Sequence, residues 1–248
     1  MINIEKLHFS YSTGDFHLYI SKLKVEKGGK VAVIGPSGSG KTTLLNLIAG
    51  IIPVKNGDIR VGETRIDSLN DAQRRDFRIQ HIGFVFQDFE LLDYLNVKDN
   101  ILHPFRITKA LKLDKDVRER AVILAEKMGI GDKLKRQTND LSHGEKQRTA
   151  ICRALLPHPK LILADEATGN LDPENKDRIL DLLFKAVDEH EASLLAVTHD
   201  HELLRKFDRI VDFRNFQSKG QDQNSDADCL YHTDFISSRI PPASVGRE

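Results

Sequence analysis

Residues 35–42 read Gly35-Pro36-Ser37-Gly38-Ser39-Gly40-Lys41-Thr42, between a short apolar run and a segment of helical spacing. The glycines let the backbone curl so that successive amide groups point inward, where they can bind phosphate oxygens. The start of the following helix adds partial positive charge. We expect Lys41 to reach the β- and γ-phosphates of a nucleoside triphosphate and the Thr42 hydroxyl to bind Mg²⁺. A glycine-rich turn that contains a lysine by chance is the alternative, and neither reading distinguishes an ATPase from a GTPase or a kinase.

Apolar runs of four or five residues predict buried parallel strands at residues 31–34, 82–86, 161–164 and 194–197. Helical patterns separate them, at residues 42–49, 116–128, 142–156 and 173–190. Strands that alternate with helices imply a mostly parallel sheet covered on both faces. A short helix at 201–207 and a last strand at 209–213 complete this pattern.

The N-terminal residues alternate apolar and polar side chains, which predicts strands of a partly antiparallel sheet. Asn56-Gly57 predicts a hairpin turn leading into Ile59 and Val61. We therefore expect an α/β fold: a P-loop NTPase core with a mostly parallel sheet, an N-terminal antiparallel β-subdomain and an inserted α-helical subdomain at about residues 88–156. The polar composition of residues 216–248 predicts a loosely ordered C-terminal tail.

The bulk composition limits the partners. Lys+Arg and Asp+Glu both number 37, so no overall basic field attracts the chain to nucleic acid, and none is expected as a partner. Cys152 and Cys229 fit neither a disulfide framework nor a metal site, which favours a reducing compartment. We expect no signal peptide and no spanning helix, because no apolar run approaches the roughly 18–20 residues that a bilayer requires.

Two acidic residues, Asp165 and Glu166, follow the apolar run at 161–164. The strand end would place Asp165 near the Mg²⁺ held by Thr42. Glu166 would then accept a proton from the attacking water or orient it. Adjacent acids can also begin a solvated loop, but the phosphate-binding loop upstream favours the catalytic interpretation.

Further motifs occur in a fixed order along the chain: Tyr11, Gln87, Leu141-Ser142-His143-Gly144-Glu145, Gly169-Asn170-Leu171-Asp172 and His199. Together they resemble the adenine-stacking aromatic, Q-loop, signature, D-loop and switch histidine of ABC transporter nucleotide-binding domains. The resemblance covers about residues 1–215. The run at 164–172 looks most like the bacterial group that serves lipoprotein release, macrolide or peptide export, and cell division.

The resemblance implies roles for individual residues. Catalytic roles fall on Gln87, Asp165, Glu166 and His199, and Mg²⁺ would be held by Thr42, Gln87 and Asp165. The residues implied to bind ATP are Tyr11, Gly35, Pro36, Ser37, Gly38, Ser39, Gly40, Lys41, Thr42, Thr43, Ser142, Gly144, Glu145 and Asp172. Two of these have plainer alternatives: Tyr11 can be a packing aromatic, and Ser142 with Glu145 also forms a helix capping box.

The resemblance also implies partners. Two such domains pair head to tail as a homodimer, with each ATP between the phosphate-binding loop of one chain and the signature of the other. An integral membrane transporter subunit would dock on the helical subdomain, where apolar side chains follow Gln87 as a mixture of exposed patch and core: Phe89, Leu91, Leu92, Tyr94 and Leu95. The expected location is cytoplasmic, peripheral on the inner face of the cell membrane.

One departure from the family pattern concerns the signature. His143 replaces the first glycine of the usual pair, so its side chain would either crowd the γ-phosphate or add charge beside it. Two rival functions are a soluble ABC ATPase without a membrane partner and a P-loop kinase or GTPase. A kinase or GTPase function gives no reason for the signature, Gln87 and His199.

Overall fold

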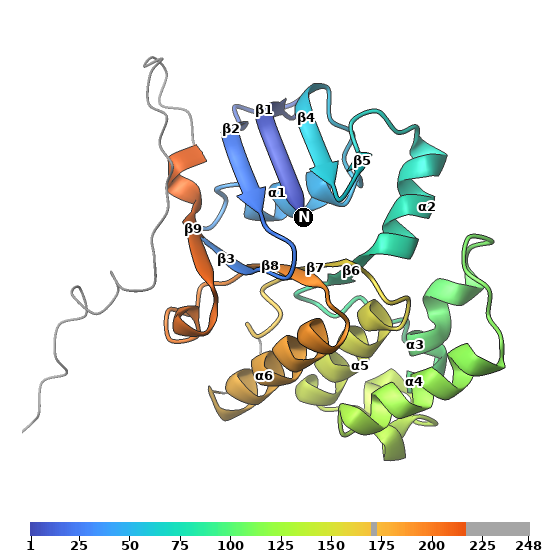
Figure 1. Ribbon diagram of the computed structural model, residues 1–248. Coiled ribbons are helices and arrows are strands. Elements are labelled where there is room, and N and C mark those ends of the chain that lie inside the picture. Colours follow the sequence, from blue (N-terminus) through green and yellow to red (C-terminus); the bar gives the residue numbers. More distant parts are fainter. Residues whose placement is uncertain (170–172, 217–248) are drawn as a thin grey trace, which may run out of the picture.

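Two sheets form the frame of the computed structural model, which describes residues 1–169 and 173–216 (Figure 1). The first is antiparallel, in the order β2 (His17–Val25), β1 (Ile2–Ser10), β4 (Asn56–Val61) and β5 (Thr64–Arg65). The second is parallel, in the order β6 (Ile82–Val85), β7 (Leu161–Asp165), β8 (Ser193–Val197), β3 (Lys30–Ile34) and β9 (Arg209–Asp212). The expected combination of a parallel core and an N-terminal antiparallel sheet is confirmed.

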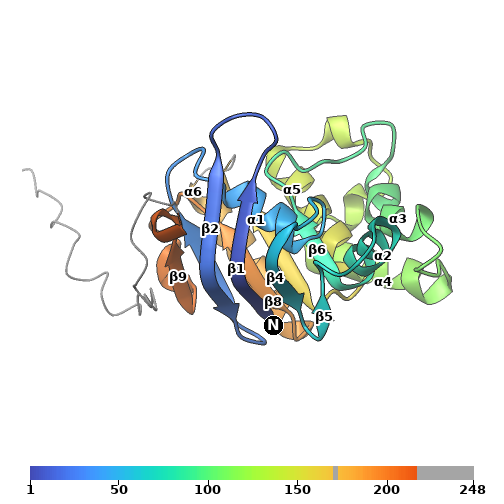
Figure 2. The ribbon, with the colours of Figure 1, turned by 90° about the horizontal axis from the view of Figure 1, so that it is seen from above.

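Six α-helices accompany the described strands: α1 (Lys41–Ile48), α2 (Asp71–His81), α3 (Val97–Arg106), α4 (Lys115–Lys127), α5 (His143–Leu155) and α6 (Pro173–Glu189). The antiparallel sheet lies over one face of the parallel sheet, with α1 between them, and α3 and α4 are set to one side (Figures 1 and 2). Helices α5 and α6 cover the opposite face (Figure 1).

The period of two in each buried strand divides the apolar side chains between two cores. In β7, Leu161 and Leu163 face the core shared with α1 and the antiparallel sheet, whereas Ile162 and Ala164 face α5 and α6. Both faces of the parallel sheet are therefore dry, as continuous apolar runs predict.

The predicted hairpin turn at Asn56-Gly57 is wrong. Both residues lie in β4, where Asn56 pairs with His8 across a bulge in β1. A Cβ on Gly57 would lie 2.5 Å from the carbonyl oxygen of Lys6, so glycine is needed there for close approach of two strands. The actual turn is at Gly62, between the paired residues Val61 and Thr64.

Other boundaries also differ from the sequence pattern. The helix predicted at 201–207 contracts to a single 3₁₀ turn, Leu204–Lys206. Helix α2 has no fully buried residue and so gives no apolar stripe to recognise. Phe216, the first residue of the predicted tail, is buried against Phe213 at an edge-on angle, and residues 217–248 lie outside the described part of the chain.

Candidate nucleotide-binding and hydrolysis site

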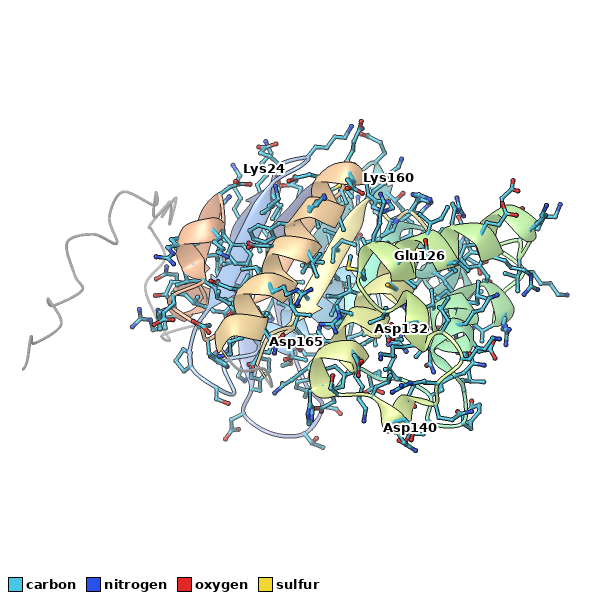
Figure 3. The ribbon with its side chains drawn as sticks, turned by 90° about the horizontal axis from the view of Figure 1, so that it is seen from below. Lys24, Glu126, Asp132, Asp140, Lys160 and Asp165 are labelled. Atoms are coloured by element: carbon cyan, nitrogen blue, oxygen red, sulfur yellow. The ribbon has the colours of Figure 1, made fainter. Side chains whose placement is uncertain are left out.

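The residues predicted to bind phosphate and to catalyse hydrolysis lie at or just after the carboxyl ends of parallel strands, along one edge of the sheet. The phosphate-binding loop follows β3, Asp165 ends β7, and His199 comes two residues after β8. Register pairs Asp165 with Val197 and Val33 with Val197, so these strand ends are level. Lys160 and Asp165 mark the two ends of β7 in Figure 3, and the site is at the Asp165 end.

The phosphate-binding loop turns into α1 through Gly40, which has a left-handed backbone with a φ of 100°. A Cβ at this position would lie 2.4 Å from Cζ of Phe16, so the ring of Phe16 closes directly over the glycine. Within residues 1–169 and 173–216, no side chain caps the N-terminus of α1, so its first amide groups can bind a ligand. Phe16 precedes Gly40 by 24 residues, so nothing in the local sequence reveals this contact.

Lys41 is buried in the loop that it is expected to serve. Its Nζ donates hydrogen bonds to the carbonyl oxygens of Gly35 at 2.9 Å and Pro36 at 2.8 Å. Burial lowers the pKa of this ammonium, and the nearby charges of Glu166 and Asp165 act in the opposite direction. The buried hydroxyl of Ser39 has no partner among the described residues. A free helix terminus, a buried cation and an unpaired donor together fit a triphosphate.

Burial raises the pKa of the Asp165 carboxyl, and the charge of Glu166 raises it further, whereas the neighbouring hydroxyl of Thr42 lowers it. A hydroxyl and a carboxylate oxygen are suitable partners for Mg²⁺, which takes one or two carboxylates together with substrate phosphates. In the described part of the chain no cluster of three His, Cys, Asp or Glu forms a metal cage, so the ion would depend on the bound phosphates.

Glu166 and His199 are in direct contact, with Nε2 of the histidine 2.5 Å from Oε1 of the glutamate. Glu166 has a left-handed backbone with a φ of 47°, which is unfavourable for a residue with a side chain. Its amide donates to the carbonyl of Val197 and its own carbonyl accepts from Gly169, so both neighbouring segments fix this conformation. A pocket of about 760 Å³ opens beside the pair, lined also by Thr198 and Gly169.

Tyr11 lies beside the loop rather than apart from it. Its hydroxyl is 3.0 Å from Oγ1 of Thr43, while its ring packs edge-on against Phe9 and at a tilt against Phe16. The side chain remains 44% exposed. The ring therefore has both a packing role and a free surface next to the phosphate-binding loop.

The signature residues contact one another. Ser142 caps α5 and its hydroxyl accepts from the amide of Glu145, while the carboxylate of Glu145 accepts from the amide of Ser142 at 2.8 Å. This bond is the main cause of the lowered pKa of Glu145, and Lys133 adds to it from 3.7 Å. Among the described residues, no hydrogen bond joins Ser142, Gly144 or Glu145 to the phosphate-binding loop.

Two further predicted residues stand outside this cluster. Gln87 follows β6 at the same sheet edge, but it is exposed and no hydrogen bond links it to the loop within the described ranges. Asp172 lies outside the described residues.

The fold and site define a P-loop nucleoside triphosphatase. Its marks are a phosphate-binding loop ahead of a helix, an acid pair at the end of a nearby strand, and a histidine against the second acid. A family model described as "ABC transporter" matches residues 18–169. The chain belongs to the ABC transporter family, as an ATP-binding ATPase subunit.

Named relatives agree with this assignment. The chain is 42% identical over 214 residues to the macrolide export ATP-binding/permease protein MacB of Rhodopirellula baltica, but the match spans 85% of the chain and only 31% of MacB. It is 36% identical to the lipoprotein-releasing system ATP-binding protein LolD of Legionella pneumophila, covering 85% of the chain and 93% of LolD. The dimeric ATP-binding cassette MJ0796, bound to ADP and Pi after hydrolysis, superimposes with a TM-score of 0.77 at 30% identity, over 88% of the chain and 94% of the cassette.

Proposed function

We propose that the chain hydrolyses ATP at the sheet edge that holds Lys41, Asp165, Glu166 and His199, and that it drives a membrane transport complex. The observation that carries this proposal is the contact between Glu166 and His199 beside the phosphate-binding loop. Residues 1–215 would form the ATPase domain, with residues 88–156 as its helical subdomain and 216–248 as a tail.

Each residue has a chemical task in this proposal. The backbone N–H groups of residues 37–43 and the ammonium of Lys41 would hold the β- and γ-phosphates. Thr42 and Asp165 would hold Mg²⁺, which offsets charge on the phosphates when bound. Glu166 accepts the proton of the attacking water or orients it, and His199 keeps that carboxylate in line. Gln87 would complete the metal shell from the end of β6, and Tyr11 offers the free face of its ring to adenine.

A second copy of the chain would complete the site. Ser142 is exposed at the N-terminus of α5 and makes its side-chain contacts within its own capping box, which leaves this terminus free to face a phosphate of another chain. Glu145 would act by fixing Ser142, since its carboxylate already binds the serine amide. Asp172 would link the two sites. The solved dimers of MJ0796 support pairing of two copies, and we propose that the pair is a head-to-tail homodimer.

A membrane subunit would bind the helical subdomain near Tyr94. This side chain is 77% exposed, whereas Phe89 is buried and Leu91, Leu92 and Leu95 are half-buried, so the segment presents one protruding ring on an apolar base. No described helix is long and apolar enough to cross a bilayer. The contact with the membrane subunit would hold the chain at the inner face of the membrane. The relatives named for lipoprotein release and macrolide export suggest an amphiphilic or apolar cargo chosen by that subunit.

The test is the mass of Glu166→Gln by light scattering with and without Mg²⁺ and ATP. Loss of the catalytic carboxylate should trap ATP, so we expect a shift from monomer to dimer that requires both additions. A monomer throughout, with ATP binding verified by fluorescence titration, would contradict dimer closure by this chain alone. His143→Gly in the same background then separates the causes. The ring of His143 lies toward Phe89, with the two ring centroids 6.0 Å apart. We therefore expect His143→Gly to change the dimer fraction little.

A further inference from the structure

The segment after β6 that carries Gln87 has an unusual backbone. Phe89 and Glu90 are consecutive residues with left-handed φ values of 62° and 49°. Side chains make this conformation unfavourable, and it persists only where the surroundings fix it. Two left-handed residues in a row also direct both carbonyl groups the same way, as in one turn of a helix.

Arg153 of α5 supplies the group that fixes this turn. Its Nη2 donates to the carbonyl oxygen of Phe89 at 2.6 Å, and its Nη1 donates to the carbonyl oxygen of Glu90. A guanidinium offers such a pair of parallel donors in one rigid plane, which a lysine does not. Arg153 is partly buried, and burial lowers the pKa of its guanidinium to about 10.

Helix α5 contacts the same region at two other points. Its first residue, His143, has its ring 6.0 Å from the ring of Phe89, which is buried. Its last turn packs closely on β6, because a Cβ on Gly83 would lie 2.6 Å from the carbonyl oxygen of Ala154. The strand, the turn after Gln87 and α5 are thus packed as one unit.

The other half of the segment is held by a different helix. Asn100 of α3 is fully buried and bonds to both the amide and the carbonyl of Leu92, and it also donates to the carbonyl of Leu95. Gln87 therefore lies on the α5 side of a segment held at its far end by α3, and Arg153 alone among the described side chains bonds to the turn next to it.

We propose that Arg153 is a positioning residue for hydrolysis: it holds the Phe89–Glu90 turn on α5, so that Gln87 moves as one body with the signature at the start of that helix. The inference rests on the proposed role of Gln87. Without the two bonds, the left-handed turn relaxes and Gln87 loses its fixed position, whereas the phosphate-binding loop is untouched. Turnover should then fall with little change in affinity for ATP.

The test is a double-mutant cycle of Arg153→Met and Gln87→Ala, read as steady-state turnover and KM for ATP. Methionine keeps an unbranched stem suited to a helix and removes every donor. We expect each single variant to lower kcat by roughly ten- to a hundredfold, the scale of a misplaced catalytic group, with KM within about threefold. The double variant should be no slower than Gln87→Ala. If the two losses multiply, Arg153 does not act through Gln87 and the proposal is overturned.

Three controls separate positioning from stability. Arg78→Met removes another partly buried arginine, on α2, that donates to a backbone carbonyl other than those of the Phe89–Glu90 turn, that of Ala49 at 3.2 Å. It should lower the melting temperature with near-normal turnover. Arg153→Lys, which keeps the charge but not the planar fork, should recover part of the lost turnover. Amide hydrogen exchange at residues 89–92 should accelerate in Arg153→Met, and unchanged exchange would overturn the proposal even if the variant is unstable.

Failure of this inference is distinct from failure of the proposed function. Hydrolysis by the wild-type chain tests the ATPase directly. If Gln87→Ala turns over at the wild-type rate, Gln87 has no role for Arg153 to support, and the inference falls while the ATPase stands.

Discussion

Asp165 combines a proposed chemical role with an unfavourable position, since the residue is only 8% exposed and burial is the main cause of its raised pKa. A raised pKa means that the folded state keeps the proton to a higher pH than the unfolded state. The stability due to this group is therefore complete below the ordinary value of 3.8 and is lost as the pH rises through the folded pKa. At neutral pH the ionised side chain destabilises the nucleotide-free protein.

Asp165→Asn should separate the effect of this carboxylate on stability from its proposed role in binding Mg²⁺. The variant keeps a partner for Thr42 and cannot ionise, so we expect the free energy of unfolding at pH 7 to rise by on the order of 1 kcal/mol. Hydrolysis should be lost, because the oxygen proposed to hold Mg²⁺ is replaced. Urea denaturation at pH 7 and at pH 4 measures both the gain and its disappearance in acid. A variant less stable than the wild type at pH 7 would show that the carboxylate is stabilising instead.

Gly40 is the second residue whose substitution separates two effects. Gly40→Ala adds left-handed strain and a collision with Phe16, which together should lower stability by about 2–4 kcal/mol. Gly38→Ala is the matched control, because its φ is 75° but nothing lies within 4 Å of the added Cβ. It should show the strain alone, about 1–2 kcal/mol. Thermal denaturation compares them, and equal losses would mean that Phe16 moves aside freely.

Among the elements, two helices begin with the same device. Ser142 and Glu145 form a capping box at α5, and Asn70 and Gln73 form one at α2. Ser142→Ala and Asn70→Ala should each reduce stability by about 1 kcal/mol. Only Ser142→Ala should weaken the ATP-dependent dimer of Glu166→Gln, which light scattering measures. If Asn70→Ala weakens the dimer equally, the effect of Ser142 is one of capping and not of contact with the partner's nucleotide.

Elements with strong local signals were predictable from sequence. The strands β3, β7 and β8 are continuous apolar runs, and helix α5 begins where Ser142 and Glu145 indicate. The strand conformation of Asn56-Gly57 was not predictable, because this glycine serves contact with a bulge in a strand about fifty residues earlier. Helix α2 lies on the surface without a buried face, so no apolar period marks it.

At the scale of the whole molecule, parallel topology explains why so much of the site could be predicted. Residues that follow strands of one parallel sheet must meet at one edge, so the sequence alone places Lys41, Asp165 and His199 together. Contacts that depend on packing could not be found in this way. The ring of Phe16 over Gly40 and the bonds of Arg153 to the turn after Gln87 join segments 24 and 63 or more residues apart. The contacts of the signature cannot be derived from one chain, since the nucleotide that it is proposed to contact is bound by another copy.

The position of Lys41 has a consequence for the kinetics of the nucleotide. Its ammonium has already given up most of its water to the carbonyls of Gly35 and Pro36. Much of the dehydration of this cation thus precedes ATP binding, which then exchanges carbonyl oxygens for phosphate oxygens. The same carbonyls can take the ammonium back when products leave. In the nucleotide-free loop, the two carbonyl oxygens occupy the positions around the ammonium that phosphate oxygens take when ATP binds. Repeated cycles of hydrolysis can therefore proceed without rehydration of Lys41 in each cycle.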